Sequence, residues 1–218
     1  MSKTMFRQVP KTGVIFTTAS AMKLGFYRGH PDWCNFGQGQ PETGFLDGGL
    51  ERISHIHIDE GDHEYAPVGG LLELREAIAN MYNTLYRKNK KSKYTAENVS
   101  IAGGGRTILT RLVAAIDTIN LGHFLPDYTA YEELLSTFKG FNTIPIMLDP
   151  DNGYTFSHQD LRKEIQGKGL GAVLASNPCN PTGKTISGRH LREWIKVSRD
   201  TGCSLIMDEF YSRPKRSY

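Results

Sequence analysis

Short apolar runs alternate with helical stretches through the second half of the chain. The apolar runs lie near residues 99–101, 123–125, 143–147, 172–175 and 205–207, and the helical stretches between them lie near 106–119, 129–138, 158–166 and 188–199. Short apolar runs that alternate with helices are typical of a parallel sheet covered by helices. The pattern therefore predicts an α/β fold, a three-layer sandwich around a mostly parallel sheet.

The first part of the chain has a different pattern. Residues 1 to about 64 contain many turn formers, among them Gly37, Gly39 and Pro41, and show little helical periodicity, which predicts an arm and loops. From Leu71 to Leu85 apolar residues recur at helical spacing, and this predicts an amphipathic helix.

Composition and charge exclude several classes of partner. The 218 residues are 39% hydrophobic, and 26 Lys and Arg against 23 Asp and Glu give a net charge of +3, too small to indicate nucleic acid or a membrane surface. The N-terminus lacks the apolar stretch of a signal peptide, and no apolar run approaches the roughly 20 residues that span a bilayer. We therefore expect a cytoplasmic protein whose three cysteines are reduced thiols.

Polar side chains follow two of the predicted strands at their carboxyl ends, where open α/β sheets bind ligands. Asn180 follows the run 172–175, and Asp208 and Tyr211 follow 205–207. A carboxylate such as Asp208 can pair with a protonated pyridine nitrogen, and the Asn180 amide and Tyr211 hydroxyl can donate to a phenolate oxygen. The simpler alternatives are a helix cap for Asp208 and a plain turn for Asn180.

Two further segments suit a planar, phosphorylated ligand. The three glycines from Gly103 to Gly105 precede a predicted helix, so their backbone N–H groups can approach a phosphate, with Arg106 or Thr107 as a further donor. Tyr128 follows a strand end and can stack on a planar ring. Each segment also has an ordinary reading, a tight turn for the glycines and helix-start packing for the tyrosine.

Two loops of the first half supply other candidates. The backbone N–H of Gly39 can bind a carboxylate because no side chain obstructs it, although a plain turn also explains this segment. Tyr65 lies in the second loop. His55 and His57 share one face of an extended segment, but the nearby acidic residues lack ordered ligand spacing, so we expect no metal site.

Together these segments, from about Phe36 to Tyr211, resemble the class I and II aminotransferases, which are pyridoxal-phosphate enzymes of fold type I. The resemblance implies pyridoxal 5'-phosphate as the cofactor. It implies that the cofactor phosphate is bound by Gly104, Gly105 and Arg106, and that the ring is contacted by Tyr128, Asn180, Asp208 and Tyr211.

The resemblance also implies roles for Gly39 and Tyr65. Gly39 would meet the substrate carboxylate, and Tyr65 would reach the phosphate in the neighbouring subunit of a homodimer. Residues 1–45 would form an N-terminal arm and part of a small domain. Residues 46–218 would form the cofactor-binding large domain, incomplete at its C-terminus.

In this family a Schiff-base lysine and a carboxylate-binding arginine come several strands after the aspartate. Lys215 is only seven residues past Asp208 and Lys184 belongs to the turn after Asn180, so neither is placed as that lysine. We expect the chain to be an N-terminal half whose catalytic lysine lies elsewhere. The chain alone is then inactive, and the missing C-terminal half completes the enzyme.

The implied reaction of the full-length protein is amino-group transfer between an amino acid and a 2-oxo acid. Two alternatives stay open at this point. One is a pyridoxal-phosphate-dependent lyase or cyclase of the same fold, because one fold hosts several such reactions. The other is a non-catalytic binding or regulatory remnant.

Overall fold

The structure is a computed structural model that describes residues 11, 13–39, 44–45, 47–49, 51–135 and 140–212. The chain divides into two compact units, and the boundary in the sequence lies between Glu64 and Tyr65. The predicted domain boundary between residues 45 and 46 is a different division of the chain, and it stays a prediction.

The first unit contains an α-helix, α1 (Gly13–Lys23), and a 3-10 helix, η1 (Glu60–His63). The prediction of an arm and loops for this part of the chain did not include this helix. None of the eleven residues of α1 is buried. Sequence periodicity reveals a helix only when one of its faces is apolar and packs against a core. A helix without such a face, such as α1, gives no periodic signal in the sequence.

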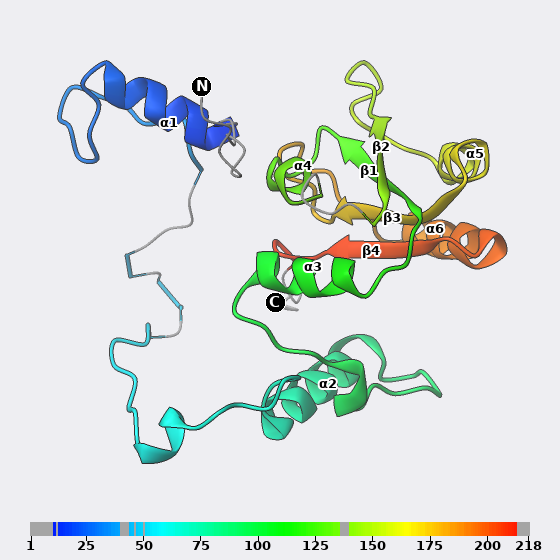
Figure 1. The fold of residues 1–218 in the computed structure, drawn as a ribbon, viewed down its shortest axis with the longest axis horizontal. Helices are drawn as coiled ribbons and strands as arrows, with labels where there is room; N and C mark the ends of the chain where they lie inside the picture. Colours follow the sequence, from blue (N-terminus) through cyan, green and yellow to red (C-terminus); the bar gives the residue numbers. More distant parts are fainter. Residues whose placement is uncertain are drawn as a thin grey trace, which may run out of the picture. The chain divides into compact units, whose positions relative to one another are not determined.

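The second unit is built on a four-stranded parallel sheet with the strand order β2-β1-β3-β4 (Figure 1). The strands are β1 (Asn120–Leu125), β2 (Asn142–Met147), β3 (Leu170–Ser176) and β4 (Ser204–Asp208). Six of the seven residues of β3 are buried, as expected of a parallel strand covered on both faces. These strands confirm the predicted parallel sheet.

Helices cover both faces of this sheet. The core on one face joins the strands to α3 (Gly105–Ala114) and α4 (Ala130–Leu135), through buried residues such as Val113, Tyr131 and Leu174. The core on the other face joins them to α5 (His158–Lys168) and α6 (Gly188–Thr201), through residues such as Leu161 and Trp194. The predicted three-layer sandwich is confirmed.

Two elements precede α3 in the second unit. The amphipathic helix predicted from Leu71 is present as α2 (Leu72–Tyr86), and η2 (Ala96–Asn98) is a 3-10 helix. The strand predicted at residues 99–101 is absent, since Val99 ends η2 and the N–H of Ile101 donates to the carbonyl of Gly69. A strand needs a neighbouring strand for its backbone groups, and none of the described strands pairs with this segment.

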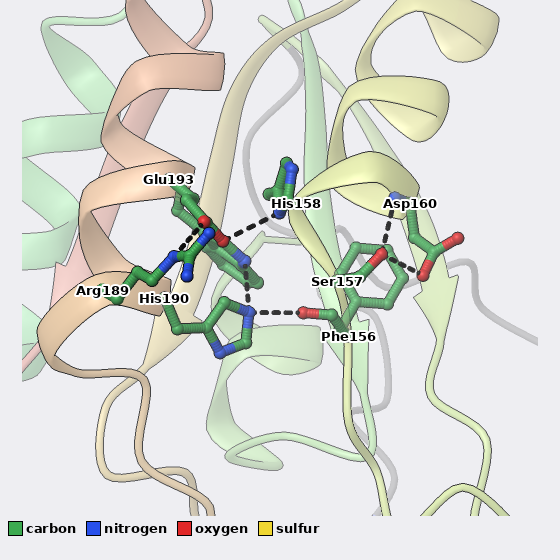
Figure 2. A network of polar contacts seen from close by, with 8 residues as sticks. Phe156, Ser157, His158, Asp160, Arg189, His190 and Glu193 are labelled. Carbon is green, nitrogen blue, oxygen red and sulfur yellow. Dashed lines mark hydrogen bonds and ion pairs between the residues drawn. The ribbon is translucent and has the colours of Figure 1, made fainter.

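Polar contacts join α5 and α6 near their N-terminal ends (Figure 2). Both helices lie on the same face of the sheet. Ser157 caps α5, because its hydroxyl accepts a hydrogen bond from the N–H of Asp160 at 3.1 Å. His158 Nδ1 lies 3.0 Å from a carboxylate oxygen of Glu193, whose other oxygen accepts from Arg189 Nε at 2.9 Å. These contacts fix the two helices that follow β2 and β3.

Within the described ranges, no helix is both long enough and apolar enough to cross a membrane.

Candidate functional site

A pocket of about 170 Å³ lies at the carboxyl ends of β1, β3 and β4, beside the N-terminus of α3. The chain leaves β1 toward α4 on one face of the sheet and leaves β3 toward α6 on the other, so the pocket lies where the connections diverge. Its lining residues are Gly105, Arg106, Leu109, Tyr128, Ser176, Asn180, Asp208, Phe210 and Tyr211. The structure therefore brings together most of the residues that the sequence singles out.

Asp208, the last residue of β4, is held by two hydrogen bonds. Its Oδ2 accepts from the hydroxyl of Tyr131 at 2.7 Å, and its Oδ1 accepts from the backbone N–H of Phe210 at 3.1 Å. Burial raises the pKa of the Tyr131 hydroxyl far above its usual range, and the hydrogen bond to Asp208 adds to this shift. The hydroxyl therefore stays protonated and acts as the donor.

Sequence reasoning assigned no role to Tyr131. Tyr131 is the second residue of α4 and Tyr128 lies before that helix, so no helical spacing in the sequence links the two. The link from Tyr131 to Asp208 spans 77 residues, so only the fold reveals it.

Asn180 and Tyr211 meet from the segments that follow β3 and β4. The side-chain amide nitrogen of Asn180 lies 3.4 Å from the hydroxyl oxygen of Tyr211. Both groups carry hydrogen-bond donors, and at this distance both can reach one acceptor in the pocket. This is the relation that the sequence predicted for a phenolate oxygen.

A buried carboxylate connects the segments that follow β1 and β3. Asp127 accepts hydrogen bonds from the N–H and the hydroxyl of Ser176, and from the N–H of Tyr128 at 2.7 Å. The Ser176 hydroxyl oxygen also accepts from the N–H of Asn180 at 3.1 Å. Burial raises the pKa of Asp127, while the hydrogen bonds from Ser176 oppose the shift. Sequence reasoning assigned no role to Asp127 or Ser176, yet they fix Tyr128 and Asn180.

The N-terminus of α3 offers free donors beside the pocket. Gly104 precedes the helix with φ of 104°, a conformation that favours glycine. In the described part of the chain, the backbone N–H groups of Gly105 and Arg106 have no hydrogen-bond acceptor. A Cβ built on Gly104 or Gly105 would find no heavy atom within 4 Å. Free amides with open space before them at a helix N-terminus suit an anion such as phosphate.

The aromatic residues beside Asp208 pack against one another. Tyr128 is half-buried, and its ring meets the ring of Tyr131 edge-on, with centroids 5.6 Å apart and an interplanar angle of 88°. The ring of Tyr211 meets that of Phe210 at 5.0 Å and 84°. Tyr128 thus lines the pocket, as its predicted stacking role requires.

Other predicted residues lie apart from this pocket or cannot be placed against it. Tyr65 is fully exposed and does not line the pocket. Gly39 is exposed and belongs to the first unit, where a Cβ built on it would meet no atom within 4 Å. Lys184 lines a different pocket, of about 200 Å³, and Lys215 lies outside the described residues.

Residues 31–213 match the family described as aminotransferase class I and II. The match covers most of the chain, so the chain belongs to this family. The predicted resemblance is thereby confirmed, and membership of the family implies pyridoxal phosphate as the cofactor.

Individual relatives agree with this membership. The chain is 27% identical over 184 residues to a probable aspartate/prephenate aminotransferase of Aquifex aeolicus, covering 83% of this chain and 44% of the relative. It is 26% identical over 174 residues to 1-aminocyclopropane-1-carboxylate synthase 6 of Arabidopsis thaliana, covering 75% of this chain and 33% of the relative. The chain thus spans less than half the length of these relatives.

A solved structure shows the same fold. The aspartate aminotransferase of Thermus thermophilus with maleate superposes with a TM-score of 0.58 at 25% identity, covering 68% of this chain and 38% of that chain. The parallel sheet with helices on both faces is therefore the fold type I architecture that the sequence predicted.

Proposed function

We propose that the pocket beside α3 holds pyridoxal phosphate, and that the protein transfers an amino group between an amino acid and a 2-oxo acid. The observation that carries this proposal is the placement of Asp208. Its carboxylate, fixed by Tyr131 and Phe210, lies in one pocket with the free amides of α3 and the Asn180–Tyr211 pair.

The donor set fits the three polar groups of this cofactor. The phosphate would be held by the amides of Gly105 and Arg106, and the phenolate oxygen by Asn180 and Tyr211. Asp208 would pair with the ring nitrogen, and Tyr128 would cover one face of the ring.

Bound pyridoxal phosphate supplies an electron sink for the substrate's α-carbon. Asp208 would keep a positive charge on the ring nitrogen, which would strengthen that sink. The donors of Asn180 and Tyr211 would orient the ring by its oxygen, while the amides of α3 would hold the phosphate. Asp127 and Ser176 keep Tyr128 and Asn180 in place while these contacts form.

The test separates binding from turnover, because no lysine is among the described residues that line the pocket. Pyridoxamine 5'-phosphate, which needs no lysine for attachment, is titrated into the 218-residue chain by calorimetry. We expect saturable binding, and we expect amino transfer only when a polypeptide supplying the lysine is also present.

Asp208→Ala should weaken this binding by about one to two powers of ten, because loss of a hydrogen bond to a charged group costs about 1.5–3 kcal/mol. Asp200→Ala is the matched control, since Asp200 forms a surface ion pair with Arg162. Unchanged affinity in Asp208→Ala, or equal losses in both variants, would show that Asp208 does not contact the cofactor.

The similarity to 1-aminocyclopropane-1-carboxylate synthase 6 favours a second candidate, a pyridoxal-phosphate-dependent lyase or cyclase. Product analysis distinguishes the two. Amino transfer requires a 2-oxo acid acceptor, whereas elimination or cyclisation consumes the amino acid without one. Cofactor binding with neither reaction, even with the lysine supplied, would favour the non-catalytic alternative.

A homodimer and a cytoplasmic location are further parts of the proposal. The full exposure of Tyr65 leaves its hydroxyl free to reach a second subunit, the role that the family resemblance gives it. Gly39, also exposed, keeps its proposed role at the substrate carboxylate. Sedimentation of the full-length protein at micromolar concentration checks the assembly, and an active monomer would contradict it.

A further inference from the structure

Tyr131 is the least exposed polar side chain beside the candidate cofactor pocket. Its residue exposure is 1%, and its ring packs in the core formed by α3, α4 and the sheet, with Leu121, Leu135 and Leu174. A ring held on all sides keeps its hydroxyl in one direction. That direction leads to Oδ2 of Asp208, at 2.7 Å.

The carboxylate of Asp208 needs such a contact to keep its orientation. The terminal torsion of an aspartate is broad, so its side-chain rotamer alone does not fix the plane of the two oxygens. The N–H of Phe210 holds Oδ1 and the hydroxyl of Tyr131 holds Oδ2. Two donors on different oxygens fix the plane of the carboxylate. With one donor, the carboxylate can still rotate about that single hydrogen bond.

The same ring also supports Tyr128, which it meets edge-on. Tyr131 therefore contacts both the side chain proposed to cover the cofactor ring and the carboxylate proposed to meet its nitrogen. A hydrogen bond between Asp208 and that nitrogen is strong only when the oxygen lies near the plane of the ring.

We propose that Tyr131 is a positioning residue, which sets the orientation of Asp208 relative to Tyr128 so that the carboxylate meets the cofactor's ring nitrogen in the ring plane. This inference rests on the proposed cofactor site. The competing explanation is that Tyr131 only fills the core and uses Asp208 as a convenient acceptor for its buried hydroxyl.

Two ligands separate these explanations in the 218-residue chain. One is pyridoxamine 5'-phosphate, and the other is its carbocyclic analogue, in which C–H replaces the ring nitrogen. Tyr131→Phe keeps the ring and removes the hydroxyl. It should weaken pyridoxamine phosphate about tenfold, as the loss of a hydrogen bond to a charged group does, and change the affinity of the analogue by less than about twofold.

The matched control is Tyr154→Phe, because Tyr154 lines the other pocket, the one that contains Lys184. This control should leave both affinities unchanged. Equal losses for the two ligands in Tyr131→Phe would overturn the inference, because a purely structural role cannot distinguish the ring nitrogen. Failure of the unmodified chain to bind pyridoxamine phosphate would instead overturn the proposed cofactor site.

A second measurement keeps the inference testable if Tyr131→Phe does not fold. 3-Fluorotyrosine at position 131 keeps the ring and the hydroxyl, adds one small fluorine atom, and makes the hydroxyl more acidic. The ¹⁵N resonance of bound, ring-labelled pyridoxamine phosphate should then move, because a changed donor alters the partner of the ring nitrogen. An unmoved resonance would contradict the inference.

Discussion

The neighbouring strands β3 and β4 lead to the two halves of the candidate site, yet they are held in place differently. Six of the seven residues of β3 are buried, whereas none of the five residues of β4 is. The strands pair in parallel from Ala172 with Ser204 to Ser176 with Asp208. Burial therefore changes sharply between two adjacent strands.

The difference shows where packing positions a functional residue and where hydrogen bonds do. Ser176, the last residue of β3, and Asn177 after it are both buried, so the segment leading to Asn180 begins inside the core. At the end of β4, Asp208 is only half-buried and depends on Tyr131 and Phe210. We expect stability to depend on β3 and its supports, and ligand binding to depend on the contacts of Asp208.

The largest expected effect is a loss of stability when the core that packs against β3 is disrupted. Trp194 of α6 is 1% exposed and belongs to the same core as Val173 and Ala175. Trp194→Ala should lower the free energy of unfolding by about 3–5 kcal/mol, because it removes a large buried ring and leaves a cavity. Urea unfolding followed by circular dichroism measures this loss.

The control lies one residue along the same helix. Ile195 is 37% exposed, so Ile195→Ala should cost less than about 1 kcal/mol. Equal losses in the two variants would show that the core beneath β3 does not dominate the stability.

A matched pair of leucines compares the strands directly. Leu174 of β3 is 2% exposed, and Leu205 of β4 is half-buried. Leu174→Ala should cost about 2–5 kcal/mol, and Leu205→Ala about 1–2 kcal/mol, because the second removes less buried surface. Equal unfolding midpoints in urea would contradict the contrast between β3 and β4.

The smallest expected effect is a pH dependence at the end of β3. Burial raises the pKa of Asp127, so the folded chain keeps this proton to a higher pH than the unfolded chain does. The contribution of Asp127 to the free energy of unfolding should therefore fall as pH rises from about 4, by at most about 1.4 kcal/mol per pH unit.

Asp127→Asn replaces the titratable carboxyl group with an amide that does not titrate, so this variant is the reference. The stability of the unmodified chain minus that of Asp127→Asn should decrease between pH 4 and 6, measured by urea unfolding in matched buffers. A difference that grows over this range would mean that the hydrogen bonds from Ser176 outweigh the burial of Asp127.

The sequence predicts the two central strands, β1 and β3, well because most of their residues are buried. Apolar runs such as 172–175 stand out when both faces of a strand are covered. The helix α1 was not predicted, and the segment 99–101 was predicted wrongly, for the opposite reason. The helix α1 buries no residue, and the apolar segment from Val99 to Ile101 has no described strand beside it.

Some residues of the candidate site could also be predicted from the sequence, and others could not. Asn180, Asp208 and Tyr211 were predictable because chemistry follows strand ends, and the fold brings these ends to one edge. Tyr131 and Ser176 were not, because their roles depend on partners 77 and 49 residues away in the chain. The roles given to Gly39 and Tyr65 come from the family resemblance and stay predictions.

The strand order also bears on how the chain folds while it is being made. In the sheet β1 lies between β2 and β3, but in the sequence β2 comes before β3, and Asn120 pairs with Leu170 across about 50 residues. At a synthesis rate of about 5–20 residues per second, β3 emerges from the ribosome several seconds after β1. During that interval β1 can pair only with β2, and its other edge is open to chaperones or to a wrong partner.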